Sequence, residues 1–451
     1  MLYFTLFALL YANVVLSLPL NVDHEQSPLF LSQFIKSNQS LLAKESAKVV
    51  NLPNAPNITS YAGYFTVNET TNSNLFFWFF PCEDPKAPVA IWLQGGPGAA
   101  STFGLFTEHG PFVVHADMTV GLRNYTWTKM LSMLYIDQPV GTGFSFTDSE
   151  EGYRNTQEEI GSDLYVFLQH FYQVFPEQRP NDLWISGESY AGKYVPAIAY
   201  KLYQERATSQ MNFKGVAIGD GYVDGMLQNN YADLLYQIGM FDENEARKGR
   251  KIEQQVRELA IKGEYRQCHD VLDAYIDGDR AKTTLFTNST GSRNYYNFLQ
   301  VTNAGDPYGA YLARDDVRQA IHVGNHTMSD GNKVYDHLIE DECKSVKHWL
   351  EELIDAGYET LLYNGQLDVI VGPVITERLI QNMTWKGKDD YLKAPKNIWR
   401  VPSQPKNVAG YVKSYKNFHF AIVRNTGHMV PTDQPASAYD LIERLINGKL
   451  G

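Results

Sequence analysis

Cysteine is scarce in this chain: its 451 residues contain only Cys82, Cys268 and Cys343. At most one disulfide can form, which leaves one thiol over, and we expect the pair to be Cys268 with Cys343. No cysteine lies in a glycine-rich turn, so a catalytic cysteine is not indicated. Cys-x-x-Cys and His-Glu-x-x-His patterns are also missing, and the sequence predicts no metal ion and no cofactor.

Positive charge is also in short supply. The chain has 39 Lys and Arg against 51 Asp and Glu, a formal net charge of -12, and no block rich in Lys or Arg. Nucleic acids and anionic membranes are therefore poor candidate partners. With 44% hydrophobic residues, a chain of this length can form one large α/β domain with an insertion.

Long apolar runs are confined to the N-terminus. Residues 2–16 are mostly apolar and small residues follow, so we expect residues 1–17 to be a signal peptide, although no Lys or Arg precedes the run. A membrane anchor is the alternative, but the run falls short of the roughly 20 residues that a span needs. Seven glycosylation sequons also favour a secreted protein, or one delivered to lysosomes or endosomes: Asn38, Asn57, Asn68, Asn124, Asn288, Asn325 and Asn382.

Strand-like and helix-like segments alternate along most of the chain. Residues 61–67 and 75–80 are predicted to form a hairpin, and 89–93, 131–136, 213–219, 359–363 and 418–423 are predicted strands. A capping box at Thr156–Glu159 opens a predicted helix, and 437–446 forms the last one. This alternation predicts an α/β fold with a mostly parallel central sheet and helices on both faces.

The pattern of predicted secondary structure changes along the chain and divides it into segments. We expect residues 18–55 to be an irregular lead-in or a pro-segment, and 56–221 to be the first part of the core. Charged, helix-like segments at 243–262 and 265–276 then replace the alternation, so we interpret 222–313 as an inserted, mainly helical cap. Predicted helices at 314–322 and 344–356 begin the second part of the core, 314–451.

The most informative stretch is 183–192, Leu-Trp-Ile-Ser-Gly-Glu-Ser-Tyr-Ala-Gly. It matches the Gly-x-Ser-x-Gly signature, with Ala191 in place of the second glycine. Small neighbours permit a tight strand-to-helix turn that exposes Ser189 at a helix N-terminus. Such a match also occurs by chance, and the strand–turn–helix setting is what favours a nucleophile.

Two further residues could activate this serine. Asp368 and His428 each follow a predicted strand, and in parallel sheets the functional loops lie beyond the carboxyl ends of the strands. A serine hydroxyl needs a base, and the base needs a carboxylate that orients it. Taken singly, His428 could be a solvated loop histidine and Asp368 a capping residue. The chain order Ser, Asp, His is that of the α/β-hydrolases, which favours a catalytic triad.

Residues 94–98, Gln-Gly-Gly-Pro-Gly, follow a predicted buried strand and could supply an oxyanion donor. We choose the Gly96 and Tyr190 N–H groups as donors; a flexible connection or a phosphate loop is the alternative, but no Gly-Lys-Ser/Thr follows. Glu188 and Glu108 need a different explanation. If both line the site, they would share a proton and one could bind an anionic substrate end, unless Glu108 is a surface acid.

Four motifs together resemble those of the serine carboxypeptidases: residues 92–98, 137–145, 187–192 and 427–431. The resemblance extends from about residue 61 to the C-terminus and is strongest to the vitellogenic carboxypeptidase-like branch. It implies an α/β-hydrolase fold with a cap, and release of one C-terminal amino acid at acid pH. It also implies the following roles: Ser189 as nucleophile, His428 as base, Asp368 as its orienter, Gly96 and Tyr190 as the oxyanion hole, Trp92, Gln94, Glu108 and Glu188 as the site for the substrate carboxylate, and Met429 in the leaving-residue pocket.

The chain departs from this family in several places. Gln94 replaces the usual Asn, so its longer amide must fold back to make the same contact. Ala99 and Ala100 replace a Cys-Ser pair, Val371 replaces a cysteine, and the usual cap disulfides are missing. These differences concern the cap and substrate preference rather than the three catalytic positions.

The expected partners are peptides or proteins with a free C-terminus, bound by a monomer or a homodimer. Two other functions stay open on the sequence alone. One is a serine esterase or acyltransferase of the same fold, which would not require a free substrate carboxylate. The other is a non-catalytic storage or binding protein that retains the fold.

Overall fold

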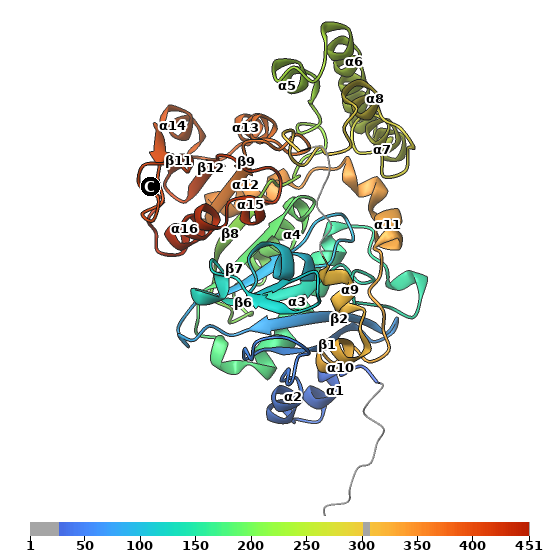
Figure 1. Cartoon of the computed structure of the whole chain (residues 1–451), viewed down its shortest axis with the longest axis vertical. Helices are drawn as coiled ribbons and strands as arrows, with labels where there is room; N and C mark the ends of the chain where they lie inside the picture. The colour runs from blue at the N-terminus through green and yellow to red at the C-terminus, as the bar shows by residue number, and fades with distance from the viewer. Residues whose placement is uncertain (1–26, 301–306, 451) are drawn as a thin grey trace, which may run out of the picture.

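A computed structural model describes residues 27–300 and 307–450 (Figure 1). The expected signal peptide and the start of the expected lead-in lie outside these ranges. Within them, every helix is too short or too polar to cross a membrane.

One ten-stranded sheet forms the centre of the molecule, in the order β1-β2-β6-β3-β7-β8-β9-β12-β11-β10. Six neighbouring strands, β6, β3, β7, β8, β9 and β12, run parallel, and antiparallel strands flank them on both sides. The prediction of a mostly parallel sheet is confirmed. The strands are β1 Tyr61–Asn68, β2 Ser73–Phe80, β3 Val89–Leu93, β6 Ser132–Asp137, β7 Leu183–Glu188, β8 Phe213–Gly219, β9 Glu359–Gly365, β10 Lys396–Trp399, β11 Gly410–Tyr415 and β12 Phe418–Val423.

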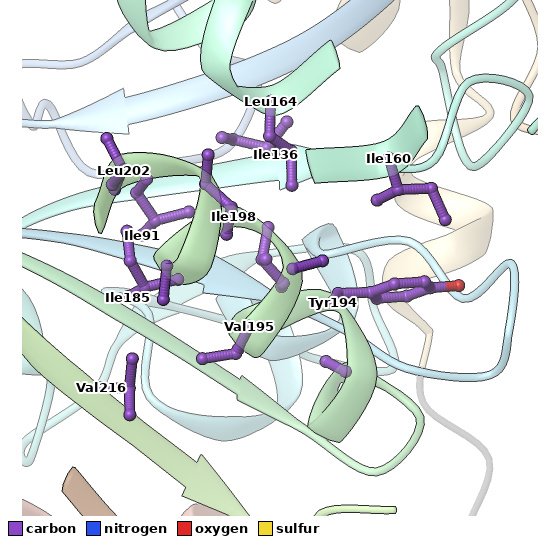
Figure 2. Packing of buried hydrophobic residues seen from close by; sticks show 14 of the residues in the cluster. Ile91, Ile136, Ile160, Leu164, Ile185, Tyr194, Val195, Ile198, Leu202 and Val216 are labelled. Atoms are coloured by element: carbon purple, nitrogen blue, oxygen red, sulfur yellow. The ribbon is translucent and has the colours of Figure 1, made fainter. Parts of the chain in front are cut away.

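Helices cover both faces of this sheet because its central strands are apolar on both. Ile91 of β3 and Ile185 of β7 face a cluster that includes Ile198 of α4, as Figure 2 shows, whereas Trp92 and Trp184 face the opposite cluster. The first cluster contains residues of α3 Gln157–Val174, α4 Ala191–Gln204, α12 Lys347–Asp355 and α13 Pro373–Asn382; the second contains residues of α9 Tyr308–Leu312, α10 Asp315–Ala320 and α16 Pro435–Ile446.

Local sequence patterns determine the start of α3 and the pairing of β1 with β2. The Thr156 side chain accepts from the Glu159 N–H while the Glu159 carboxylate accepts from the Thr156 N–H, so the predicted capping box begins α3. The expected hairpin is formed by β1 and β2, which pair antiparallel.

Between β8 and β9 the chain forms helices that stand apart from the sheet, at the top of Figure 1. They are α5 Ala232–Gln237, α6 Glu243–Lys262, α7 Tyr265–Asp273 and α8 Leu285–Thr290, and they have an apolar cluster of their own. The expected disulfide is present: Cys268 of α7 is bonded to Cys343, which follows α11 Asn332–Glu342. We retain 222–313 as the proposed cap insertion.

Several short elements were not predicted. The expected irregular lead-in contains α1 Leu31–Lys36 and α2 Ser40–Ser46, each a helix of six or seven residues that packing rather than periodicity stabilises. Strands β10 and β11 were also not predicted from the sequence. In β10, three of the four residues are exposed, and its sequence has no alternation of apolar and polar residues. The other elements without an individual prediction include β4 Phe112–Val114, β5 Val120–Leu122, α14 Lys388–Lys393 and α15 Val430–Asp433, and also α5, α8, α9, α11 and α13.

Candidate active site

Ser189 occupies the sharp turn between β7 and α4 and has a φ of 63°, a left-handed conformation that a non-glycine residue rarely adopts. Its N–H donates to the Gly219 carbonyl at 3.0 Å, and its carbonyl accepts from the Tyr222 N–H at 2.9 Å. A Cβ added to Gly187 would lie 2.6 Å from the Leu93 carbonyl oxygen, and one on Gly192 would lie 2.5 Å from the Tyr222 nitrogen. Close packing therefore requires the small residues of the motif.

Asp368 and His428 come from loops after β9 and β12, which are parallel neighbours. The His428 Nδ1 lies 2.8 Å from the Asp368 Oδ2, and both side chains are buried. Asp368 also accepts from the backbone N–H groups of Ile370 and Val371, at 2.9 and 3.3 Å. A carboxylate held as an acceptor in this way places the proton on Nδ1 and leaves the His428 Nε2 free to act as a base.

The His428 Nε2 is buried and has no hydrogen-bond partner in the described part of the chain. His428 and Ser189 both line a cavity of about 420 Å³. Other residues lining this cavity are Gln94, Gly96, Glu188, Tyr296 and Met429. The structure therefore brings together the predicted nucleophile, the predicted base and most of the predicted substrate-binding residues.

The glycine-rich loop after β3 lies directly against the serine turn. A Cβ on Gly95 would lie 2.5 Å from the Tyr190 nitrogen and 2.8 Å from the Ser189 Cβ. Within the described residues, neither the Gly96 N–H nor the Tyr190 N–H donates to a protein acceptor. Two unused donors beside a nucleophile are what an oxyanion site requires.

The two glutamates predicted to form a pair do meet. Glu108 ends a buried π-helical turn, Gly104–Glu108, and its buried carboxyl group lies next to that of Glu188. Gln94 connects the pair to the sheet: its Nε2 donates to Glu188 at 3.0 Å, and its Oε1 accepts from the Trp92 Nε1 at 2.8 Å. The longer side chain of Gln94 thus reaches the pair, and Glu108 is not a surface acid.

Both glutamates are protonated more easily than exposed ones. Burial raises the pKa of Glu108 to about 7, an effect that interactions with Glu188 and Gln94 reduce. Burial, and then the charge of Glu108, raises the pKa of Glu188 well above its usual range. At acid pH the pair therefore carries at least one proton that can be donated to a ligand.

Comparison with known proteins identifies this architecture. The model of the serine carboxypeptidase family, Peptidase S10, matches residues 51–448. The chain belongs to the serine carboxypeptidase family. It is therefore a serine-type carboxypeptidase, a hydrolase that acts on peptides.

Individual relatives agree with this assignment over nearly the whole chain. The probable serine carboxypeptidase CPVL of Homo sapiens is 47% identical and aligns with 98% of this chain and 94% of its own length. The venom serine carboxypeptidase of Apis mellifera is 42% identical over 94% of this chain and 93% of its own, and the vitellogenic carboxypeptidase of Aedes aegypti is 38% identical over 92% and 89%.

The crystal structure of Kex1, a prohormone-processing carboxypeptidase from Saccharomyces cerevisiae, superposes with a TM-score of 0.76 at 24% identity. It covers 90% of this chain and 96% of that chain. This likeness shows that the carboxypeptidase has the expected α/β-hydrolase fold.

The predicted glycosylation sites do not line the cavity. Six of the seven sequon asparagines are exposed and Asn68 is half-buried, which leaves them accessible to glycosylation enzymes without showing occupancy.

No role was assigned from the sequence to two sets of acidic residues near Ser189. One is Asp220, directly after β8, and the other is the set Asp277, Asp279 and Glu342, which lines a second cavity. The position of Asp220 after a strand was the only available signal.

Because the Gly95 backbone contacts the serine turn, we expect Gly95→Ala to displace Ser189 from its position. A displacement of about 1 Å should lower the rate of Ser189 labelling by a fluorophosphonate about 100-fold. Gly309→Ala is the matched control, since a Cβ there meets no atom within 4 Å. Equal labelling rates for both variants and the unaltered enzyme would contradict the close packing described here.

Proposed function

We propose that this carboxypeptidase releases C-terminal amino acids from peptides or proteins at acid pH, through an acyl-enzyme on Ser189. His428 Nε2 accepts the hydroxyl proton as the Ser189 Oγ attacks the last peptide carbonyl, and Asp368 stabilises the imidazolium. The Gly96 and Tyr190 N–H groups donate to the developing oxyanion. His428 then protonates the leaving amine, and a water molecule repeats the sequence to release the shortened peptide.

The observation that supports this proposal best is the buried pair of Glu108 and Glu188 beside the nucleophile. Glu188 and Gln94 line the same cavity as Ser189. A protonated carboxyl group there can donate a hydrogen bond to the terminal carboxylate of a peptide, whereas two carboxylates would repel it. Gln94, held by Trp92, adds an amide donor, and Met429 offers an apolar surface to the leaving side chain.

We further propose that the enzyme enters the secretory pathway and acts outside the cell or in lysosomes or endosomes. The apolar segment at the N-terminus and the seven sequons support this location. A lysosomal or endosomal pH would keep the glutamate pair protonated.

The terminal carboxylate should decide which peptides are substrates. We expect the enzyme to shorten a peptide acid at pH 5 and to leave the C-terminal amide of the same sequence at least about 10-fold less processed, with products measured by mass spectrometry. Ser189→Ala should yield no product, whereas Ser162→Ala, which alters an exposed serine, should be unaffected. Equal processing of acid and amide would instead favour the esterase or acyltransferase interpretation.

The pH dependence should differ between peptides and esters. The competent form of the glutamate pair is protonated, so it is present below about pH 7 and lost as the pH rises through the raised pKa of Glu108. We therefore expect kcat/KM for peptide acids to fall above about pH 7 while ester hydrolysis persists. In Glu188→Gln the amide remains a donor at every pH, so the fall should weaken. Identical pH profiles for peptides and esters would contradict the role of the pair.

The second cavity is also lined by Ser189, together with Asp277, Asp279 and Glu342. We propose that the leaving residue occupies the first cavity, so that the residue before the cleaved bond lies here. Within the described residues, no Lys or Arg lies within 4 Å of the Asp277 or Asp279 carboxylates, and Glu342 is 3.5 Å from the Nε2 of His269. Burial and the charges of neighbouring acids raise the pKa of Asp277 to about 8, and a cationic side chain bound here would favour the ionised forms of these acids.

We accordingly expect Lys or Arg at the penultimate position of the peptide to be preferred. A gain of about tenfold in kcat/KM over Leu corresponds to about 1.4 kcal/mol. Asp277→Asn and Asp279→Asn should reduce this ratio, while Asp315→Asn, at an exposed acid, should not. A ratio that both pocket variants leave unchanged would remove these carboxylates from substrate selection.

A further inference from the structure

Asp220 is a fully buried carboxyl group that the proposed reaction does not use. It follows β8 directly and has a φ of 44°. Its Oδ1 accepts from the Gly365 N–H at 2.9 Å and lies 3.5 Å from the Asn364 Nδ2. In the described part of the chain, no group donates a hydrogen bond to its Oδ2.

This unpartnered side chain lies at the proposed base. One oxygen of Asp220, one oxygen of Asp368 and one nitrogen of His428 all lie within 4.8 Å of one another. At this separation two buried carboxylates would repel each other strongly. The repulsion is relieved if one of the two carries a proton.

The donors around each group indicate which one carries it. Asp368 accepts from three donors, namely His428 Nδ1 and the N–H groups of Ile370 and Val371, and these donors occupy both of its oxygens. Asp220 accepts from two groups, both at one oxygen, and its other oxygen is unpaired. The proton therefore belongs on Asp220.

The remaining neighbours favour the same assignment. Besides Asp368 and His428, the titratable groups near Asp220 in the described residues include Glu188, from β7, and Tyr363, from β9. None of these is a permanent cation, and burial followed by the charge of Asp368 raises the pKa of Asp220 well above its usual range.

We propose that Asp220 is a positioning residue: as a neutral acid it donates a hydrogen bond to Asp368 and holds that carboxylate against the His428 Nδ1. Its neutrality has a chemical consequence. A second negative charge at this place would hold a proton on His428 and so remove the base at acid pH. This inference rests on the proposed roles of Ser189, Asp368 and His428 but not on those of the glutamate pair.

Ester hydrolysis is the appropriate readout because it needs the serine and its base without the carboxylate site. Asp220→Asn keeps a neutral donor, so we expect kcat/KM for an ester to stay within about threefold and the midpoint of its acid limb to be unchanged. Asp220→Leu has no donor, and kcat should fall about 10- to 100-fold with little change in KM. Asp224→Asn is the control, since Asp224 is equally buried but accepts from Met226, Leu227 and Ser345.

Three results would overturn the proposal. If Asp220 is an anion, Asp220→Asn will lower the midpoint of the acid limb by about one pH unit. This measurement tests the neutrality of Asp220 even if the leucine variant fails to fold. Full activity in a folded Asp220→Leu enzyme would remove the positioning role. Loss of activity on treatment with a chelator, reversed by a divalent cation, would show that Asp220 and its neighbours hold a metal ion instead.

Failure of the proposed reaction itself would be recognised separately. In that case Ser189→Ala would retain ester hydrolysis, or peptide acids and amides would be processed equally, whatever the Asp220 variants do.

Discussion

The parallel register of four neighbouring strands is the constraint on which the rest of the site depends. Glu188 of β7 lies opposite Gly219 of β8, Gly219 opposite Tyr363 of β9, and Gly365 opposite Val423 of β12. Each strand therefore ends at the same edge of the sheet, and the residues that follow it meet there. Because the strands are hydrogen-bonded on both sides, these side chains sit on a rigid support rather than on free loops.

Burial of acids is the second property of this edge. Glu108, Glu188, Asp220 and Asp368 are all nearly inaccessible to water. Desolvation opposes ionisation, so such groups persist only if protons are shared between them or donors surround them. Two pairs result, one facing the substrate side of Ser189 and the other facing His428. The first pair joins the last residue of β7 with the end of the Gly104–Glu108 turn, and the second joins residues that follow β8 and β9.

This arrangement supports the proposed activity at acid pH. In the proposed reaction, protonation of the Glu108–Glu188 pair favours binding of a carboxylate, but the same conditions tend to protonate a catalytic histidine. A neutral Asp220 limits the negative charge around His428 to that of Asp368. The two carboxyl pairs thus meet opposite requirements at one pH, although they lie at adjacent strand ends.

The sequence predicted most of the sheet, since buried parallel strands are short apolar runs with turn residues after them. It also located Ser189, Asp368 and His428, because the serine turn has strict local requirements and the other two follow strands. The short helices α1 and α2 and the strands β10 and β11 escaped prediction. Their stability comes from contacts with distant segments, which leave no periodic pattern in a stretch of six residues.

Some conclusions belonged to the sequence alone: the α/β class, the order of the catalytic candidates, and a possible glutamate pair at Glu108 and Glu188. These depend on local geometry and on residue type. Only the tertiary structure decided that Glu108 is buried against Glu188, that Gln94 reaches both Trp92 and the pair, and that Asp220 adjoins Asp368. Those contacts join segments up to about 150 residues apart, and their distances follow from strand order and packing, which no local pattern encodes.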